Sequence, residues 1–467
     1  MDSPILNYDV LLAILAQCES HQTGLRLMST CRLLYQEGVK VLLRREVRLD
    51  REKRLVSFLF FLRLKEPTIP ARPQHVHALV LDMYNVSLEV AELFGLVCPF
   101  LIGLKSLELS NVAWICDQHP DLIVAVAMLQ SLNHLTLSFW AGDRAMVKLL
   151  KILRAPLRTL SVDWRSCISD SFWDTIKEAT WPAFHPTIIL ENFAETLEEL
   201  TCTWWWMTGT YIPPHTTYPR MRRLVINYTE TTFVLAPFIH AFPNLTHMLV
   251  ETSHEEWEGF YADFVERGHT SHVQNVSQQL LPPSNGGRMW HRMEEFSGYF
   301  YDLYIFGLAC KIDRLILKDS SSGTAFFPFL SEVLSYTCPT YLDYAIFSDG
   351  LELLCTGLRE ADSVARSRLD TLIVRYTLEY WEADTSFSCE METLTSAIQG
   401  IPLRDLRLAL EETVPEGLDM AALAMKVINE MPTLQEVTFS TPGQSRHLQD
   451  VTTFGRDGLR SRSVATV

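Results

Sequence analysis

The chain has 467 residues and a formal net charge of −16 at pH 7, from 40 Lys and Arg against 56 Asp and Glu. Hydrophobic residues make up 48% of it and charged residues 21%, which excludes wholesale disorder, and the acidic balance argues against nucleic-acid binding, which needs a positive face toward the phosphates. At about 150 residues per domain the length allows roughly three domains, unless the chain is a repeat array, which grows without enlarging a single core.

Ten cysteines are scattered along the chain and none forms a Cys-x-x-Cys pair, so no zinc ribbon or thioredoxin-like motif is predicted. The N-terminus lacks the basic and then apolar segments of a secretion signal. The longest apolar runs, at residues 55–62 and 122–129, are far shorter than the ~20 residues that cross a bilayer. We therefore expect a cytoplasmic or nuclear protein with reduced cysteines and no membrane association.

The first 50 residues are predicted to form short helices. Asn7 can cap the first of them. A break at residues 19–24 precedes a short segment, and residues 29–30 offer the cap of a longer helix that runs to Leu43. The apolar residues of the first helix recur at helical spacing, and they are Val10, Leu11, Ile14 and Leu15.

The residues at 6–15 and 25–35, which end in Cys31-Arg32-Leu33-Leu34-Tyr35, resemble an F-box. The second half is especially similar to the F-box-like proteins common in fungi. One position departs from the family pattern, because the Pro that follows the family's first Leu is Asn7 here. Asn retains the helix start through its cap but lacks the fixed φ of Pro.

This resemblance implies that residues 4–48 dock onto the Skp-type adaptor of an SCF-type ubiquitin ligase. The alternative is that this segment is only a three-helix N-terminal cap on the part of the chain that follows it. The contact residues that the resemblance implies are Leu6, Val10, Leu11, Ile14, Leu15, Leu25, Cys31 and Tyr35.

The rest of the chain repeats a pattern of three apolar positions, spaced like Leu-x-x-Leu-x-Leu, as in Leu104–Leu109 and Leu132–Leu137. Each match predicts a short strand. Helices are expected in several intervals, at residues 88–100, 121–130, 144–153 and 420–430. The central apolar positions are residues 79, 107, 135, 160, 200, 224, 248, 315, 372, 406 and 437.

The spacing and pattern resemble degenerate leucine-rich repeats of the F-box kind. The resemblance implies an α/β fold in which the N-terminal helices are followed by a solenoid, or horseshoe, with parallel strands on its concave face. A doubly wound α/β domain is the alternative. The predicted parts are the F-box-like segment at 4–48, a helical linker or cap at 49–74, the solenoid at 75–440 and a disordered tail at 441–467.

Two intervals, 251–311 and 318–368, are too long for one repeat and are predicted to hold insertions, as binding loops or as padding. The first contains a loop signal at 282–287 and an aromatic-rich helix candidate at 289–308.

No catalytic motif or cofactor-binding motif is present, so we predict no enzyme, no cofactor and no metal site. His269 and His272 could share a helix face, but a solvated loop is favoured because no third ligand lies at zinc spacing. The basic run at 40–54 is interpreted as a solvated face, although it could steer an acidic partner. At least one of Trp204–Trp206 is expected to be exposed as an interface anchor.

The sequence thus favours an adaptor protein: a substrate-recognition subunit of an SCF-type ligase that holds an unidentified substrate protein on its repeats. The alternative is a leucine-rich-repeat interaction scaffold without a ligase. Polar residues of a concave strand face are the default binding surface, and the predicted substrate contacts are His134, Arg158, Glu199, Arg223, His247 and Arg314.

Overall fold

The computed structural model describes residues 7–18, 20–63, 72–83, 86–110, 119–138, 143–163, 185–203, 216–228, 233–252, 261–281, 289–318, 328–346, 350–376, 387–410, 419–442 and 448–466. The chain divides into two compact units. The first unit comprises Met1–Thr210 and Pro214–Met221, and the second comprises Tyr211–Pro213 and Arg222–Val467.

The first unit begins with three helices, α1 (Tyr8–Gln17), α2 (His21–Met28) and α3 (Arg32–Leu43). A parallel sheet follows, whose strands lie side by side in chain order. They are β1 (Glu46–Leu49), β2 (Ala78–Asp82), β3 (Ser106–Ser110), β4 (His134–Ser138), β5 (Thr159–Asp163) and β6 (Glu199–Thr203).

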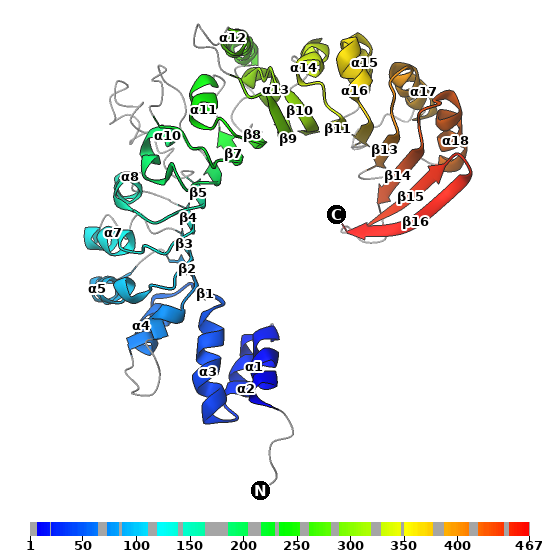
Figure 1. Cartoon of the computed structure of the whole chain (residues 1–467). Helices are drawn as coiled ribbons and strands as arrows, with labels where there is room; N and C mark the ends of the chain where they lie inside the picture. The colour runs from blue at the N-terminus through cyan, green and yellow to red at the C-terminus, as the bar shows by residue number, and fades with distance from the viewer. Residues whose placement is uncertain are drawn as a thin grey trace. The chain divides into compact units, whose positions relative to one another are not determined.

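Helices connect these strands and lie along one side of them (Figure 1). They are α4 (Glu52–Arg63), α5 (Leu88–Val97), α7 (Pro120–Ala127), α8 (Asp143–Ile152) and α10 (Pro186–Ile189), with 3₁₀ turns η1 (Arg72–His75), η2 (Cys98–Phe100) and η5 (Glu191–Phe193). Side chains alternate across a strand, so the apolar ones meet the helices. The central leucines of β2–β6 pair in register and are buried: Leu79, Leu107, Leu135, Leu160 and Leu200.

The second unit continues the same plan with eight parallel strands in chain order. They are β7 (Arg223–Tyr228), β8 (His247–Thr252), β9 (Arg292–Tyr299), β10 (Lys311–Lys318), β11 (Tyr341–Ile346), β12 (Thr371–Tyr376), β13 (Asp405–Leu410) and β14 (Glu436–Pro442). Its helices are α11 (Ala236–Ala241), α12 (Tyr261–Leu280), α13 (Phe300–Phe306), α14 (Leu330–Thr337), α15 (Gly350–Glu360), α16 (Ser363–Arg368), α17 (Phe387–Ile398) and α18 (Met420–Glu430).

The predicted α/β architecture with parallel strands is confirmed, and every predicted central apolar position lies in a strand. A doubly wound sheet carries helices on both faces. In each unit the described helices that connect successive strands lie on one side of those strands, as a solenoid-like arrangement requires (Figure 1).

The two intervals predicted to be insertions are instead complete repeats. The first supplies β9 and the second supplies β11, each with its own helices. Phe296 of β9 pairs with Met248 and Leu315, and Leu342 of β11 pairs with Leu315 and Leu372. The helix expected at 289–308 was wrong in its first half, because residues 292–299 are the strand β9 and α13 begins only at Phe300.

The expectation of a disordered tail was also wrong. Strands β15 (Leu448–Gly455) and β16 (Gly458–Thr466) form an antiparallel hairpin that pairs with β14. Polar composition suggested disorder because most of the hairpin is exposed, and Phe454 is its only described apolar side chain that is buried. The boundary expected at residue 48 falls inside β1, so α4 belongs to the first repeat rather than to a linker.

None of the described helices combines the length and the hydropathy that a membrane span requires.

Candidate protein-interaction surfaces

Each of the three N-terminal helices begins at a capping side chain. The Asn7 side-chain oxygen accepts a hydrogen bond from the Asp9 N–H at 3.3 Å, so the predicted cap is confirmed. Ser20 caps α2. The cap of α3 is Cys31, whose sulfur accepts from the Leu34 N–H at 3.4 Å. The cap predicted at residues 29–30 was wrong, because both of those hydroxyls donate to carbonyls of α2.

The core of this helical segment forms where α3 crosses α1 and α2. Leu15 is completely buried, and Met28 nearly so. Gly38 on α3 permits this crossing, because a Cβ atom there would lie 2.8 Å from Leu15 Cδ2 and 2.7 Å from Met28 Cγ. The Arg45 guanidinium completes the segment by donating to the Leu15 and Ala16 carbonyls at the end of α1, at 2.6 and 2.8 Å.

A set of large apolar side chains on these helices remains exposed, by between 40% and 56%. Val10 and Ile14 lie on one face of α1 because they are four residues apart. Exposed apolar side chains that adjoin one another, as Val10 and Ile14 do, are candidates for an interaction site. The exposed residues are Tyr8, Val10, Ile14, Leu25, Leu33 and Tyr35, and we name them the N-terminal apolar face.

The residues predicted to contact an adaptor divide into three groups. Val10, Ile14, Leu25 and Tyr35 belong to the N-terminal apolar face, and Leu11 and Cys31 are half-buried beside it. Leu15 was wrong as a direct contact, because it is buried in the core. Leu6 lies outside the described residues.

The sequence interpretation missed Tyr8 and Leu33. Leu33 stays exposed because Leu34, the next residue on α3, occupies the buried position. A helical wheel of 32–43 could have separated the two faces, since Leu34 shares its spacing with the buried Gly38.

Several basic residues of the run at 40–54 make ion pairs or hydrogen bonds within the chain. Lys40 pairs with Glu37 at 2.7 Å, and Arg54 pairs with Asp50 at 2.8 Å. Together with Arg45, which caps α1, these contacts favour the interpretation of the run as a helix face and its exit rather than as a free cationic patch.

The strand face of the first unit is rich in hydroxyl and carboxylate groups. On β2–β6 the residues that alternate with the buried apolar ones include no Lys or Arg. Its acidic members are Asp82, Glu108, Asp163 and Glu199. This face therefore favours polar or cationic partners over acidic ones.

The strand face of the second unit instead carries balanced ion pairs. Arg314 pairs with Glu295 on the neighbouring strand at 3.1 Å and lies over the Tyr341 ring at 4.7 Å. Other pairs join Lys318 to Glu251, Arg375 to Asp343, and Arg407 to Asp405. Because each of these four cations has an acidic neighbour, the pairs together add no net charge to this face.

Five of the six predicted substrate contacts lie in strands. His134 and Glu199 are in the first unit, at equivalent register positions of β4 and β6, and Arg223, His247 and Arg314 are in the second. Arg158 was misplaced by one residue: β5 begins at Thr159, and Arg158 sits before it with Glu198 at 3.8 Å.

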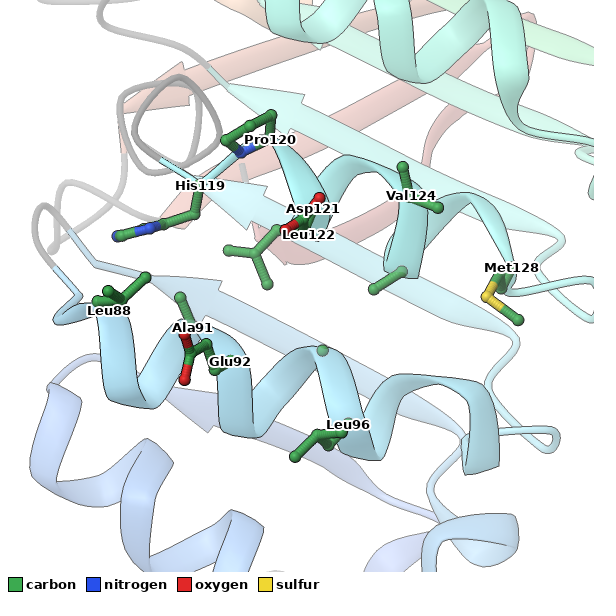
Figure 2. Close-up of a pocket in the computed structure, with 12 residues that line it drawn as sticks. Leu88, Ala91, Glu92, Leu96, His119, Pro120, Asp121, Leu122, Val124 and Met128 are labelled. Atoms are coloured by element: carbon green, nitrogen blue, oxygen red, sulfur yellow. The ribbon is translucent and has the colours of Figure 1, made fainter.

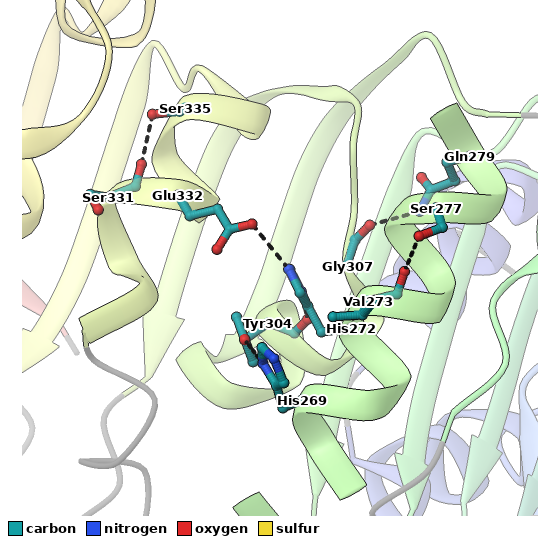
Figure 3. A network of polar contacts seen from close by, with 10 residues as sticks. All are labelled: His269, His272, Val273, Ser277, Gln279, Tyr304, Gly307, Ser331, Glu332 and Ser335. Atoms are coloured by element: carbon teal, nitrogen blue, oxygen red, sulfur yellow. Dashed lines mark hydrogen bonds and ion pairs between the residues drawn. The ribbon is translucent and has the colours of Figure 1, made fainter. Parts of the chain in front are cut away.

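His269 and His272 lie on α12, so the predicted solvated loop was wrong (Figure 3). His269 Nδ1 is 2.6 Å from the Tyr304 hydroxyl. His272 is buried, and its Nδ1–H donates to the Tyr304 carbonyl at 2.7 Å, while its Nε2 is 3.4 Å from Glu332. These contacts tie α12 to α13 and α14, which is a structural role.

Within the described ranges no three His, Cys, Asp or Glu side chains gather as metal ligands would. The cysteines Cys98, Cys202, Cys310 and Cys355 are buried, and burial raises the pKa of each thiol, for Cys98 to about 12. Buried thiols of this kind are poor nucleophiles. Trp204–Trp206 lie outside the described residues.

Comparison with known proteins adds no relative: no protein-family model matches the chain, and no curated protein does so either.

Proposed function

We propose that the chain is a substrate-recognition subunit of an SCF-type ubiquitin ligase. In this proposal the N-terminal apolar face binds the Skp-type adaptor. The strand faces of the repeat units hold the substrate protein, and other subunits carry out ubiquitin transfer. The contribution of this chain is positioning, because it holds a bound protein near the reacting groups.

The observation that carries the proposal is the exposed apolar side chains of α1–α3 directly before a series of parallel αβ repeats. Had the segment only capped the repeats, its free surface would be expected to be polar, as terminal caps are. Val10 and Ile14 instead present two apolar groups on one side of α1. The sequence order of the F-box-like residues supports the same role.

The strand faces support a protein substrate rather than a small molecule. They offer many dispersed polar groups, and repeat proteins use such surfaces for protein partners. The first unit's acidic and hydroxyl-rich strands favour a substrate segment with Lys or Arg side chains.

The test is co-purification of the full chain with a Skp-type adaptor. The double variant Val10→Asp/Ile14→Asp should abolish association, because two charges would enter an apolar contact. The matched control is Val364→Asp in the second unit, where Val364 is also exposed on a helix; it should leave association unchanged. Failure of the unaltered chain to bind the adaptor would refute the proposal.

A second function, an interaction scaffold without a ligase, is favoured by Asn7. The φ of −66° at Asn7 already suits proline, so Asn7→Pro should keep the backbone conformation at the start of α1 while it removes the side-chain cap on the Asp9 N–H. A ligase subunit should bind the adaptor at least as tightly after this change. If neither the unaltered chain nor the Asn7→Pro variant binds, the scaffold is the better description.

A further inference from the structure

A groove of about 550 Å³ runs between α5 and α7 on the helical side of the first unit (Figure 2). Its floor contains small residues, Ala91, Gly95 and Ala125. A Cβ atom at Gly95 would lie 4.0 Å from the Ala125 Cβ, which is an ordinary contact distance, so a side chain at this position would enter the groove without a clash. The absence of a side chain at Gly95 therefore helps leave the groove open.

The edges of this groove are apolar where a solvent-facing helix is normally polar. Leu88 and Leu96 on α5 are exposed by 55% and 62%, and Val124 and Met128, on and just after α7, by 50% and 55%. Surface helices usually turn charged residues toward water. Exposed leucine, valine and methionine around a concave site mark a docking surface for an apolar partner.

Among the described residues that line the groove, the charged ones are acidic. Glu92 on α5 and Asp121 on α7 face it, with His119 at one end (Figure 2). Neither helix contains a Lys or Arg residue. An occupant with its own acidic groups would be repelled, and one with cationic groups beside its apolar ones would be attracted.

We infer that the α5–α7 groove binds a basic amphipathic helix of a partner protein. The apolar side of that helix would pack between Leu96 and Val124, in the manner of a helix in a groove. Its Lys or Arg side chains would lie near Glu92 and Asp121. A second copy of this chain is a poorer occupant, because two identical acidic grooves would face each other.

This inference does not rest on the proposed ligase function, because it concerns a different surface and is tested on the chain alone. The probe is a synthetic Leu/Lys amphipathic peptide of about four helical turns, titrated into the full chain by fluorescence anisotropy. Two controls are a scrambled peptide of the same composition and a peptide with Glu in place of Lys.

The Leu/Lys peptide should bind, and its affinity should fall as salt is added. Leu96→Asp introduces a charge, and Gly95→Leu fills the floor, so each should weaken binding by about tenfold or more. Glu92→Lys/Asp121→Lys should weaken it as well. Val364→Asp, on α16 in the second unit, is the matched control and should have no effect.

Equal binding of the scrambled peptide, or equal binding by the Leu96→Asp variant, would overturn the inference. So would sedimentation that showed a dimer of the unaltered chain and a monomer of Leu96→Asp, since a second copy would then be the occupant.

Discussion

At the scale of single residues, two helix glycines of the N-terminal segment look alike in sequence and differ in structure. Gly38 lies against Leu15 and Met28, whereas a Cβ atom at Gly24 would lie 3.3 Å from Leu15 Cδ1 and 3.5 Å from Leu42 Cδ2. The contacts at Gly24 involve the ends of flexible side chains. Those at Gly38 lie below the closest approach that a Cβ atom normally makes.

We expect Gly38→Ala to destabilise the three-helix segment by ~1–2 kcal/mol, because overpacking outweighs the gain in helix propensity. Gly24→Ala should be neutral or slightly stabilising, since the propensity gain is then opposed by little strain. Amide hydrogen exchange in α1–α3 measures both changes. Equal effects of the two substitutions would contradict the packing described for Gly38.

The environment of Glu390 on α17 makes the stability of the chain depend on pH. Burial raises the pKa of its carboxyl from 4.5 to about 7. The folded state thus favours the protonated form, so the contribution of Glu390 to stability is fully present below pH 4.5 and is lost as the pH rises through 7.

Glu390→Gln should therefore match the unaltered chain in stability below pH 4.5 and become the more stable of the two between pH 4.5 and 7 and above. Glu392→Gln, on the same helix, is the control: Lys426 donates a hydrogen bond that lowers the pKa of Glu392, so its replacement should give no gain at high pH. Thermal unfolding at a series of pH values distinguishes them. A gain in stability for Glu390→Gln that did not depend on pH would contradict the raised pKa of Glu390.

At the scale of secondary-structure elements, the sequence predicted helices well where apolar spacing and flanking prolines agreed. The helix expected at 420–430 is α18, with the same bounds, and the one at 121–130 is α7 within a few residues. Strands were found where leucine held the central position, as in β3 and β4.

Two parallel strands of the second unit, β9 and β11, were not predicted, because neither carries the leucine pattern. In β9 two glutamates precede Phe296, so the leucine pattern is absent. In β11 Asp343 interrupts the apolar run, yet it is buried because Arg375 of the next strand pairs with it. Apolar spacing along one strand does not reveal an ion pair between two strands.

The hairpin β15–β16 covers the last parallel strand. Without it the edge of β14 would expose unpaired backbone groups. It also contributes Phe454, whose ring meets the buried Phe439 at a centroid distance of 6.1 Å.

Removal of residues 443–467 should therefore destabilise the final repeats by ~1.5–3 kcal/mol for each large apolar side chain that becomes exposed, and should promote self-association through β14. Light scattering and thermal unfolding measure these effects. Leu459→Asp, at an exposed position of β16, is the control and should not increase self-association. A truncated chain with unchanged Tm and no association would show that the hairpin is dispensable.

At the scale of the whole molecule, each described strand pairs with its neighbours in sequence order within its unit. Such arrays depend on nearest-neighbour contacts, which is why repeat spacing alone predicted the fold class. The candidate sites were less predictable. Ile14 and Leu15 are adjacent and equally apolar, and only the crossing at Gly38 determines that Leu15 is buried and Ile14 exposed.

We propose that the chain binds a Skp-type adaptor through its N-terminal apolar face. The most direct test is amide hydrogen exchange of the full chain with and without saturating adaptor. We predict slower exchange in α1 and α3, with no change in the strands of the second unit. Exchange in α1–α3 that stays the same at saturating adaptor, or protection confined to the second unit, would show that this face does not bind the adaptor.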